Sequence, residues 1–176
     1  YVGTANKDYD ISGFIKALLK LKALEISFKW NIVGEFSDEI KKQIKESGLN
    51  PFVQFHGYLP HNEAIKHTIA ADLLLLIIPN VKNNKLIYSG KLFEYIATTN
   101  PILCIGPHDG DAAELIKKNE LGQNFFYNEE DKIHRYLINF LNKFKNNDLA
   151  IRGFNPNRFS RETLTGKLSK LLKVNI

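Results

Sequence analysis

The residues best suited to chemistry lie where a short helix is expected to begin, in Ser89-Gly90-Lys91-Leu92-Phe93-Glu94. Ser89, Gly90 and Lys91 place free backbone N–H groups and a cation at a helix N-terminus, an arrangement that binds anions such as phosphate. The helix dipole disfavours a lysine in a first turn by roughly 0.3–1 kcal/mol, and a bound phosphate would reverse that sign. The alternative is a surface lysine that points into water, and the local pattern leaves both interpretations open.

Glu94 follows one helical turn later and can reach the same crevice. A carboxylate accepts hydrogen bonds from two adjacent hydroxyls, as on a ribose. Without further context, a solvated helix residue is the simpler interpretation of Glu94.

These residues belong to a chain in which short apolar segments alternate with amphipathic ones, a pattern typical of βαβ units. A strand ends in the turn at Gly3, and further strands are expected at 28–33, 52–55, 73–78, 102–105 and 123–126. Helices are expected from Ile11 and over 38–47, 62–70, 90–98, 111–119 and 131–144, with a last one through Leu164, Leu168, Leu171 and Leu172. The sequence therefore predicts an α/β fold, a doubly wound (Rossmann-like) parallel sheet of about six strands with helices on both faces.

In such sheets, ligands bind beyond the carboxyl ends of the strands. Five loops are expected at that edge, at residues 3–7, 34–37, 57–61, 79–91 and 106–111. The last of them carries His108-Asp109-Gly110-Asp111, which could approach a ligand, although we rather expect Asp111 simply to cap the following helix.

Composition limits the class of protein without choosing a ligand. The 176 residues carry a net charge of +5, which is compatible with anionic ligands of several kinds. Cys104 is the one cysteine, so no disulfide framework exists. The longest apolar run, 73–78, is far shorter than the roughly 20 residues that a membrane span needs. The opening Tyr1-Val2-Gly3-Thr4 suggests that the chain is a fragment.

The segment from Gly90 to Ala97, followed by Pro101, resembles a signature of the GT-B-class, group 1-like glycosyltransferases, in their C-terminal nucleotide-sugar-binding domain. Supporting matches occur in the same order along the chain, at Ile32-Val33-Gly34, Phe55-His56-Gly57-Tyr58-Leu59-Pro60, Ala70-Ala71-Asp72 and Gly122. The similarity covers essentially the whole sequence.

This resemblance implies a role for each matching position. Glu94 would bind the ribose of the donor nucleotide, while Ser89, Gly90 and Lys91 would face the diphosphate, with the Gly3-Thr4 turn opposite. The backbone at Gly57, Tyr58 and Leu59 would recognise the base. The resemblance implies no metal site and no cofactor, because a helix dipole and basic side chains can stabilise the leaving diphosphate. The catalytic residues are not identified.

The expected function is that of a glycosyltransferase domain that binds a nucleoside diphosphate sugar, preferably a UDP-sugar. Residues 1–176 would form the single C-terminal donor-binding domain, and an absent N-terminal domain would bind a polysaccharide or lipid-linked acceptor. The chain alone is then expected to be inactive, with its last helix against the other domain. The expected location is the cytoplasm, with peripheral association at the inner face of the membrane left open, and no nucleic acid partner is expected.

Two other functions stay open: half of a GT-B-fold sugar-nucleotide epimerase, and a noncatalytic α/β ligand-binding module. Leu86 occupies a position where many retaining members carry a second glutamate, so the stereochemical outcome is open as well. Other nucleotide sites are excluded by specific departures. Thr4-Ala5-Asn6 after Gly3 gives no G-x-G-x-x-G, and Leu92 replaces the Ser or Thr that a P-loop requires.

Overall fold

The fold alternates short strands with helices, as the sequence predicts. The computed structural model describes residues 1–146 and 154–174. Over these residues the elements are, in order, α1 (Ser12–Ala23), β1 (Trp30–Val33), α2 (Asp38–Glu46), η1 (Asn50–Phe52), β2 (Val53–Gly57), α3 (His61–Ile69), β3 (Leu74–Ile77), η2 (Asn84–Leu86), α4 (Gly90–Thr98), β4 (Ile102–Ile105), α5 (Asp111–Lys118), β5 (Gly122–Phe125), α6 (Glu130–Lys145), η3 (Pro156–Phe159) and α7 (Arg161–Val174). The three short 3₁₀ turns, η1 to η3, carry no helical periodicity and were not expected.

The strands are parallel, which confirms the α/β class, but they do not form one sheet of about six strands. Within the described residues there are two sheets, one of β1 and β2 and one in the order β3-β4-β5. The expected first strand is reduced to two isolated bridges, from Val2 to Val33 and from Ala5 to Phe36.

A side chain stands where the sheet would otherwise continue. The Val2 N–H group donates to the hydroxyl of Tyr95 at 3.0 Å, and that hydroxyl donates to the Leu75 carbonyl at 3.3 Å. On the other side, Gly3 N donates to Val33 O at 2.7 Å. The 1–3 segment therefore pairs directly with β1 but reaches β3 through the Tyr95 hydroxyl, and this explains the division into two sheets.

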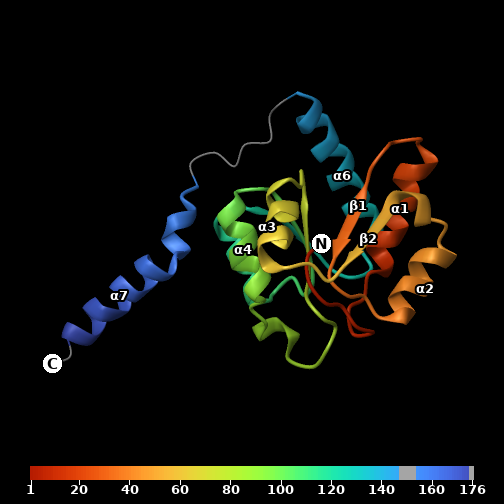
Figure 1. Cartoon of the computed structure of the whole chain (residues 1–176). Coiled ribbons are helices and arrows are strands. Elements are labelled where there is room, and N and C mark those ends of the chain that lie inside the picture. Colours follow the sequence, from red (N-terminus) through yellow and green to blue (C-terminus); the bar gives the residue numbers. More distant parts are fainter. Residues whose placement is uncertain (147–153, 175–176) are drawn as a thin grey trace.

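Both faces of the three-stranded sheet are covered by helices (Figure 1). Alternate residues of a strand point to opposite faces, so a strand buried on both sides is apolar throughout. One face packs with α1 and α6 and the other with α4 and α5, through Leu75, Ile77, Leu103 and Ile105 on the first and Leu74, Leu76, Ile102 and Cys104 on the second. This double covering accounts for the continuous apolar run that the sequence shows at β3.

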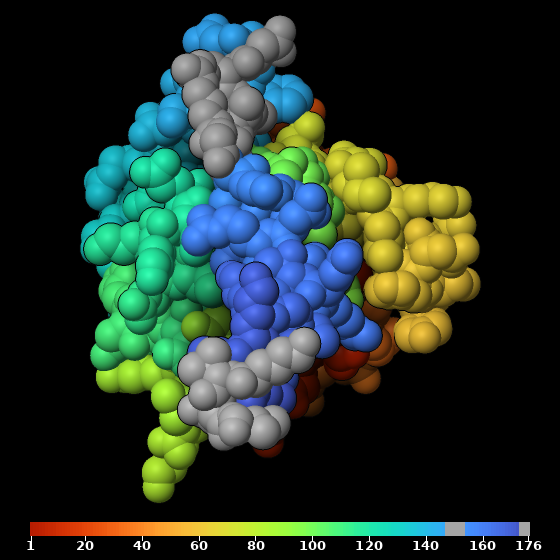
Figure 2. Space-filling model, turned by 90° about the vertical axis from the view of Figure 1, so that its left-hand side faces the viewer, coloured from red at the N-terminus to blue at the C-terminus, as the bar shows by residue number. Residues whose placement is uncertain are grey.

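The last helix, α7, extends away from the sheets (Figure 1), and Figure 2 views the molecule from that side. Its four leucines are exposed to between 45% and 64%, namely Leu164, Leu168, Leu171 and Leu172. The preceding turn η3 is anchored on α4, where the rings of Phe159 and Phe93 lie 6.3 Å apart. The leucines of α7 therefore form an apolar stripe of exposed side chains.

Among the helices of the described residues, none has both the length and the apolar character needed to cross a bilayer.

Replacing Tyr95 by Phe tests the role of its hydroxyl. The variant keeps the ring in the core but leaves the Val2 N–H group and the Leu75 carbonyl without this partner. We expect the free energy of unfolding, measured by chemical denaturation, to fall by about 1–3 kcal/mol. Tyr88→Phe is the control, because Tyr88 is 49% exposed. Equal stabilities of the two variants would contradict this role.

Candidate functional site

The start of α4 presents a helix N-terminus with a cation and no acidic residue in its first turn. Ser89 is the N-cap residue, its backbone is extended, and its side chain makes no capping hydrogen bond. A Cβ atom added at Gly90 would meet no atom within 4 Å, so nothing covers this position. Backbone N–H groups in such a first turn have no partner within the helix and can bind an anion.

The lysine of this turn crosses to the beginning of the chain. Its Nζ donates to the hydroxyl of Tyr1 at 2.6 Å and lies 3.5 Å from the carbonyl oxygen of Thr4. The same Nζ lies 4.4 Å from the ring centroid of Tyr1 and 5.8 Å from that of Tyr9. Lys91 thus contacts the Gly3-Thr4 turn, and both are positions that the resemblance assigns to the diphosphate.

Lys91 holds its charge in an unusual setting for a lysine. None of the ion pairs among the described residues involves it. Burial lowers its pKa to about 8, while the negative charge of Glu94 acts in the opposite direction. A lysine that is partly desolvated and lacks a carboxylate partner gains strongly from an incoming anion.

Three glycines lie next to one another at the carboxyl ends of adjacent segments. Gly34 N donates to Gly57 O at 2.7 Å, and a Cβ atom at Gly34 would lie only 2.5 Å from Gly3 O. A Cβ atom at Gly3 would lie 2.2 Å from Cε of Lys91. With φ at +120° and +109°, Gly3 and Gly34 also adopt backbone conformations that other residues rarely take. Gly3, Gly34 and Gly57 therefore form one surface of backbone, the glycine wall, and Lys91 lies directly over it.

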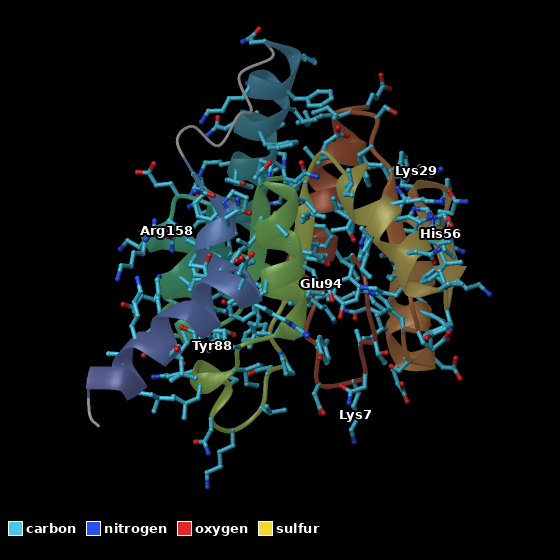
Figure 3. All side chains as sticks on the ribbon, turned by 60° about the vertical axis from the view of Figure 1, so that its left-hand side comes forward. Lys7, Lys29, His56, Tyr88, Glu94 and Arg158 are labelled. Carbon is cyan, nitrogen blue, oxygen red and sulfur yellow. The ribbon has the colours of Figure 1, made fainter. Side chains whose placement is uncertain are left out.

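The other predicted site residues lie at the same edge without direct contact to Lys91. Glu94 is exposed on α4, and Figure 3 places it on the opposite side of that helix from Tyr88. Tyr58 is 89% exposed, and Leu59 is partly buried. Among the described residues, no hydrogen bond or ion pair joins either of these two to Glu94. The predicted ribose and base positions are thus open to solvent.

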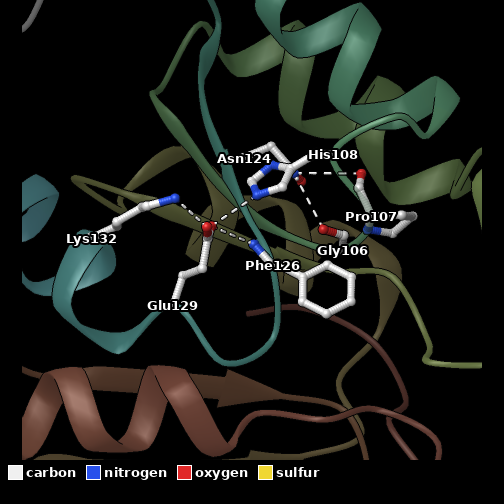
Figure 4. A network of polar contacts seen from close by, with 7 residues as sticks. All are labelled: Gly106, Pro107, His108, Asn124, Phe126, Glu129 and Lys132. Atoms are coloured by element: carbon white, nitrogen blue, oxygen red, sulfur yellow. Dashed lines mark hydrogen bonds and ion pairs between the residues drawn. The ribbon is translucent and has the colours of Figure 1, made fainter.

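A second polar network holds the loop that follows β4 (Figure 4). The Asn124 amide donates to Nδ1 of His108 at 3.3 Å, and Nε2 of His108 lies 3.0 Å from Glu129. Partial burial raises the pKa of Glu129, but bonds from Lys132, Phe126 and His108 outweigh it, so that its pKa lies below the usual value. Both ring nitrogens of His108 are engaged, so this network fastens the loop to β5 and α6.

The expected cap at Asp111 is wrong. Gly110 occupies the N-cap position of α5, and Asp111 is the first residue of the helix, where its charge suits the dipole. Within the described part of the chain, no group of three or more His, Cys, Asp or Glu side chains is arranged to hold a metal ion.

Sequence reasoning missed three tyrosines that build the site. Tyr1 and Tyr9 surround the Lys91 ammonium group, and Tyr95 fixes α4 to the 1–3 segment. Their partners are far away in the sequence, and no local spacing signals such contacts. Tyr1, two positions before Gly3, looks in the sequence like an ordinary residue of a strand.

The family model described as "Glycosyl transferases group 1" matches residues 1–152 of the chain. A comparison with curated proteins gives no match.

Solved structures with a similar fold include two that contain UDP. The pneumococcal O-GlcNAc transferase GtfA, in complex with UDP and GlcNAc, is 16% identical with a TM-score of 0.65, over 98% of this chain and 35% of its own. Anabaena HepE, in complex with UDP, is 16% identical with a TM-score of 0.69, over 98% of this chain and 48% of its own. The chain therefore spans about a third to a half of these proteins.

A third structure is that of a single domain. The C-terminal domain of the group 1 family glycosyl transferase LpcC from Francisella tularensis is 18% identical, with a TM-score of 0.62. The similarity covers 86% of this chain and 80% of that one. The fold of the chain is thus that of a C-terminal domain in a solved group 1 protein.

Gly3→Ala tests the close approach of Lys91 to the glycine wall. The added methyl group would overlap with the Lys91 side chain and force a residue other than glycine to φ +120°. We expect the free energy of unfolding to fall by about 1–3 kcal/mol. Gly90→Ala is the matched control, because its methyl group would meet nothing within 4 Å. The geometry would be contradicted if the two variants unfolded at the same denaturant concentration.

Proposed function

We propose that this chain, which belongs to the group 1 glycosyl transferases, is the donor-binding domain of such an enzyme and binds a nucleoside diphosphate sugar at the start of α4. One observation carries the proposal. Lys91, partly buried and without a carboxylate partner, lies over a wall of backbone at the N-terminus of a helix.

The diphosphate is the part of the donor for which the support is strongest. Two phosphate groups would supply the negatively charged partner that Lys91 does not have in the free domain. The free N–H groups of Ser89, Gly90 and Lys91 would add hydrogen bonds. Gly3 and Thr4 lie on the opposite side, where the absence of a Cβ at Gly3 makes room for the Lys91 side chain beside the ligand. These groups would also stabilise the charge that develops on the diphosphate as it leaves the sugar.

The nucleoside would extend from the diphosphate toward Glu94 and the Gly57–Leu59 loop. Glu94 is exposed one turn beyond Lys91, and its carboxylate would accept hydrogen bonds from the two ribose hydroxyls. The backbone at Gly57, Tyr58 and Leu59 would recognise the base. The two solved UDP complexes favour a UDP-sugar as the donor of this chain.

The acceptor would bind to a second, N-terminal domain of the complete enzyme, and residues 1–176 would be the C-terminal domain. The similarity to the C-terminal domain of LpcC supports this division. The exposed leucines of α7 offer an apolar stripe against which the other domain would pack. The acceptor would be a growing polysaccharide or a lipid-linked glycan, so the enzyme would act in the cytoplasm or at the inner face of the membrane. We expect the isolated chain to bind the donor without transferring its sugar.

A sugar-nucleotide epimerase half would use the same diphosphate and ribose contacts. Incubating the complete protein with a UDP-sugar alone separates the two functions, because an epimerase gives an epimer without an acceptor. A noncatalytic binding module would give neither an epimer nor a transfer product.

Titration calorimetry of the chain with UDP and with uridine tests the site. Loss of a charged hydrogen-bonding partner costs about 1.5–3 kcal/mol, so Glu94→Ala should weaken UDP binding roughly tenfold or more. Glu94→Ala should weaken uridine binding equally, whereas Lys91→Ala should weaken UDP binding more than uridine binding.

Lys29→Ala is the matched control, because Lys29 is exposed and precedes β1, at the opposite edge from the site. The site is wrongly assigned if UDP does not bind at millimolar concentration. It is also wrongly assigned if Glu94→Ala binds UDP as tightly as the unaltered chain does.

A further inference from the structure

Lys91 is surrounded by aromatic rings and by neutral oxygens. The hydroxyl of Tyr1 accepts its hydrogen bond at 2.6 Å, and the rings of Tyr1 and Tyr9 lie 4.4 and 5.8 Å from its Nζ. The Tyr1 hydroxyl in turn donates to the Thr4 carbonyl at 2.9 Å, which fixes the acceptor in place. A cation in such a setting is stabilised by the ring faces but loses most of its water.

We propose that Tyr1 and Tyr9 are positioning residues that hold Lys91 over the Gly3 turn without an ion pair, so that binding of a diphosphate at this site takes up a proton. This inference rests on the proposed function and adds the chemical state of the site before and after the ligand binds. Tyr1 and Tyr9 act through Lys91 and need not touch the ligand.

The electrostatics of the site support proton uptake. Burial lowers the pKa of Lys91 to about 8, and Glu94 opposes that shift. The phenol of Tyr9 also faces Lys91, and burial raises its pKa. The Tyr1 phenol stays neutral, because burial raises its pKa well above the usual value. A diphosphate beside the ammonium group favours the charged form and raises the pKa of Lys91 again.

The sign of the pH dependence follows from linkage. Because its pKa is about 8, Lys91 loses its proton between about pH 7 and pH 9 in the free chain. The complex keeps Lys91 protonated, so binding takes a proton from the buffer and the affinity falls as pH rises through this range. We expect the affinity for UDP to fall roughly fivefold to tenfold between pH 7 and pH 9.

The two tyrosines have opposite effects on the lysine, and this makes them separable. Tyr1→Phe keeps the ring but removes the acceptor of the ammonium group, so the pKa of Lys91 should fall further. Tyr9→Ala opens the ammonium group to water, so the pKa should rise toward the value of an ordinary lysine. A merely structural role in packing would not move the pKa in opposite directions.

The experiment has two parts. The first follows the Lys91 side chain by NMR as a function of pH in the unaltered chain, Tyr1→Phe, Tyr9→Ala and the control Tyr88→Phe, with Lys91→Arg to assign the signal. The second measures UDP binding by calorimetry at pH 7, 8 and 9 in buffers of different ionisation enthalpy, which gives the number of protons taken up.

The proposal predicts shifts of opposite sign for the two tyrosine variants, none for Tyr88→Phe, and proton uptake that is larger at pH 8 than at pH 7. It is overturned if Lys91 titrates as an ordinary lysine, if neither tyrosine variant moves it, or if UDP binds at pH 8 without proton uptake. If UDP does not bind at all, the proposed function fails and the proton uptake fails with it. The titrations then still decide whether the tyrosines hold the lysine.

Discussion

A single hydroxyl group, that of Tyr95, connects the two sheets and orients the helix that carries the candidate site. It accepts from Val2 and donates to Leu75, so the 1–3 segment, α4 and β3 are fixed to one another at one point. Lys91 lies one turn before Tyr95 on the same helix, and residues four apart share a helix face. The position of Lys91 over Gly3 therefore depends on the contact that Tyr95 makes with Val2.

The family and the geometry support the donor site on different grounds. The family model identifies the class of enzyme from the order of residues along the chain. The structure adds that Lys91 reaches the Gly3-Thr4 turn, a contact between residues almost ninety positions apart in sequence. Because the two observations are independent, the proposed diphosphate position does not rest on the family signature alone.

The sequence predicts elements whose signal is local and misses contacts that the tertiary fold creates. The apolar run at β3 and the periodicity of α6 are strong because burial repeats along each element. The split of the sheet was missed, because it depends on a tyrosine in α4 that replaces a backbone partner. The Asp111 cap was wrong by one position, since Gly110 can take the extended N-cap backbone as well as Asp can. The aromatic surroundings of Lys91 could not be predicted, because nothing in the local sequence around Tyr1 and Tyr9 distinguishes them from other apolar residues.

The row of Gly3, Gly34 and Gly57 has a consequence for how such a domain changes during evolution. A surface made of peptide groups offers almost the same donors and acceptors whatever side chains the rest of the chain carries. Substitution at Gly34 would press on the Gly3 carbonyl and so disturb its neighbour as well. Amino-acid substitutions at Gly3 and Gly34 are therefore strongly constrained. The Tyr58 side chain is exposed, so a substitution there would change the surface of the site without pressing on this backbone.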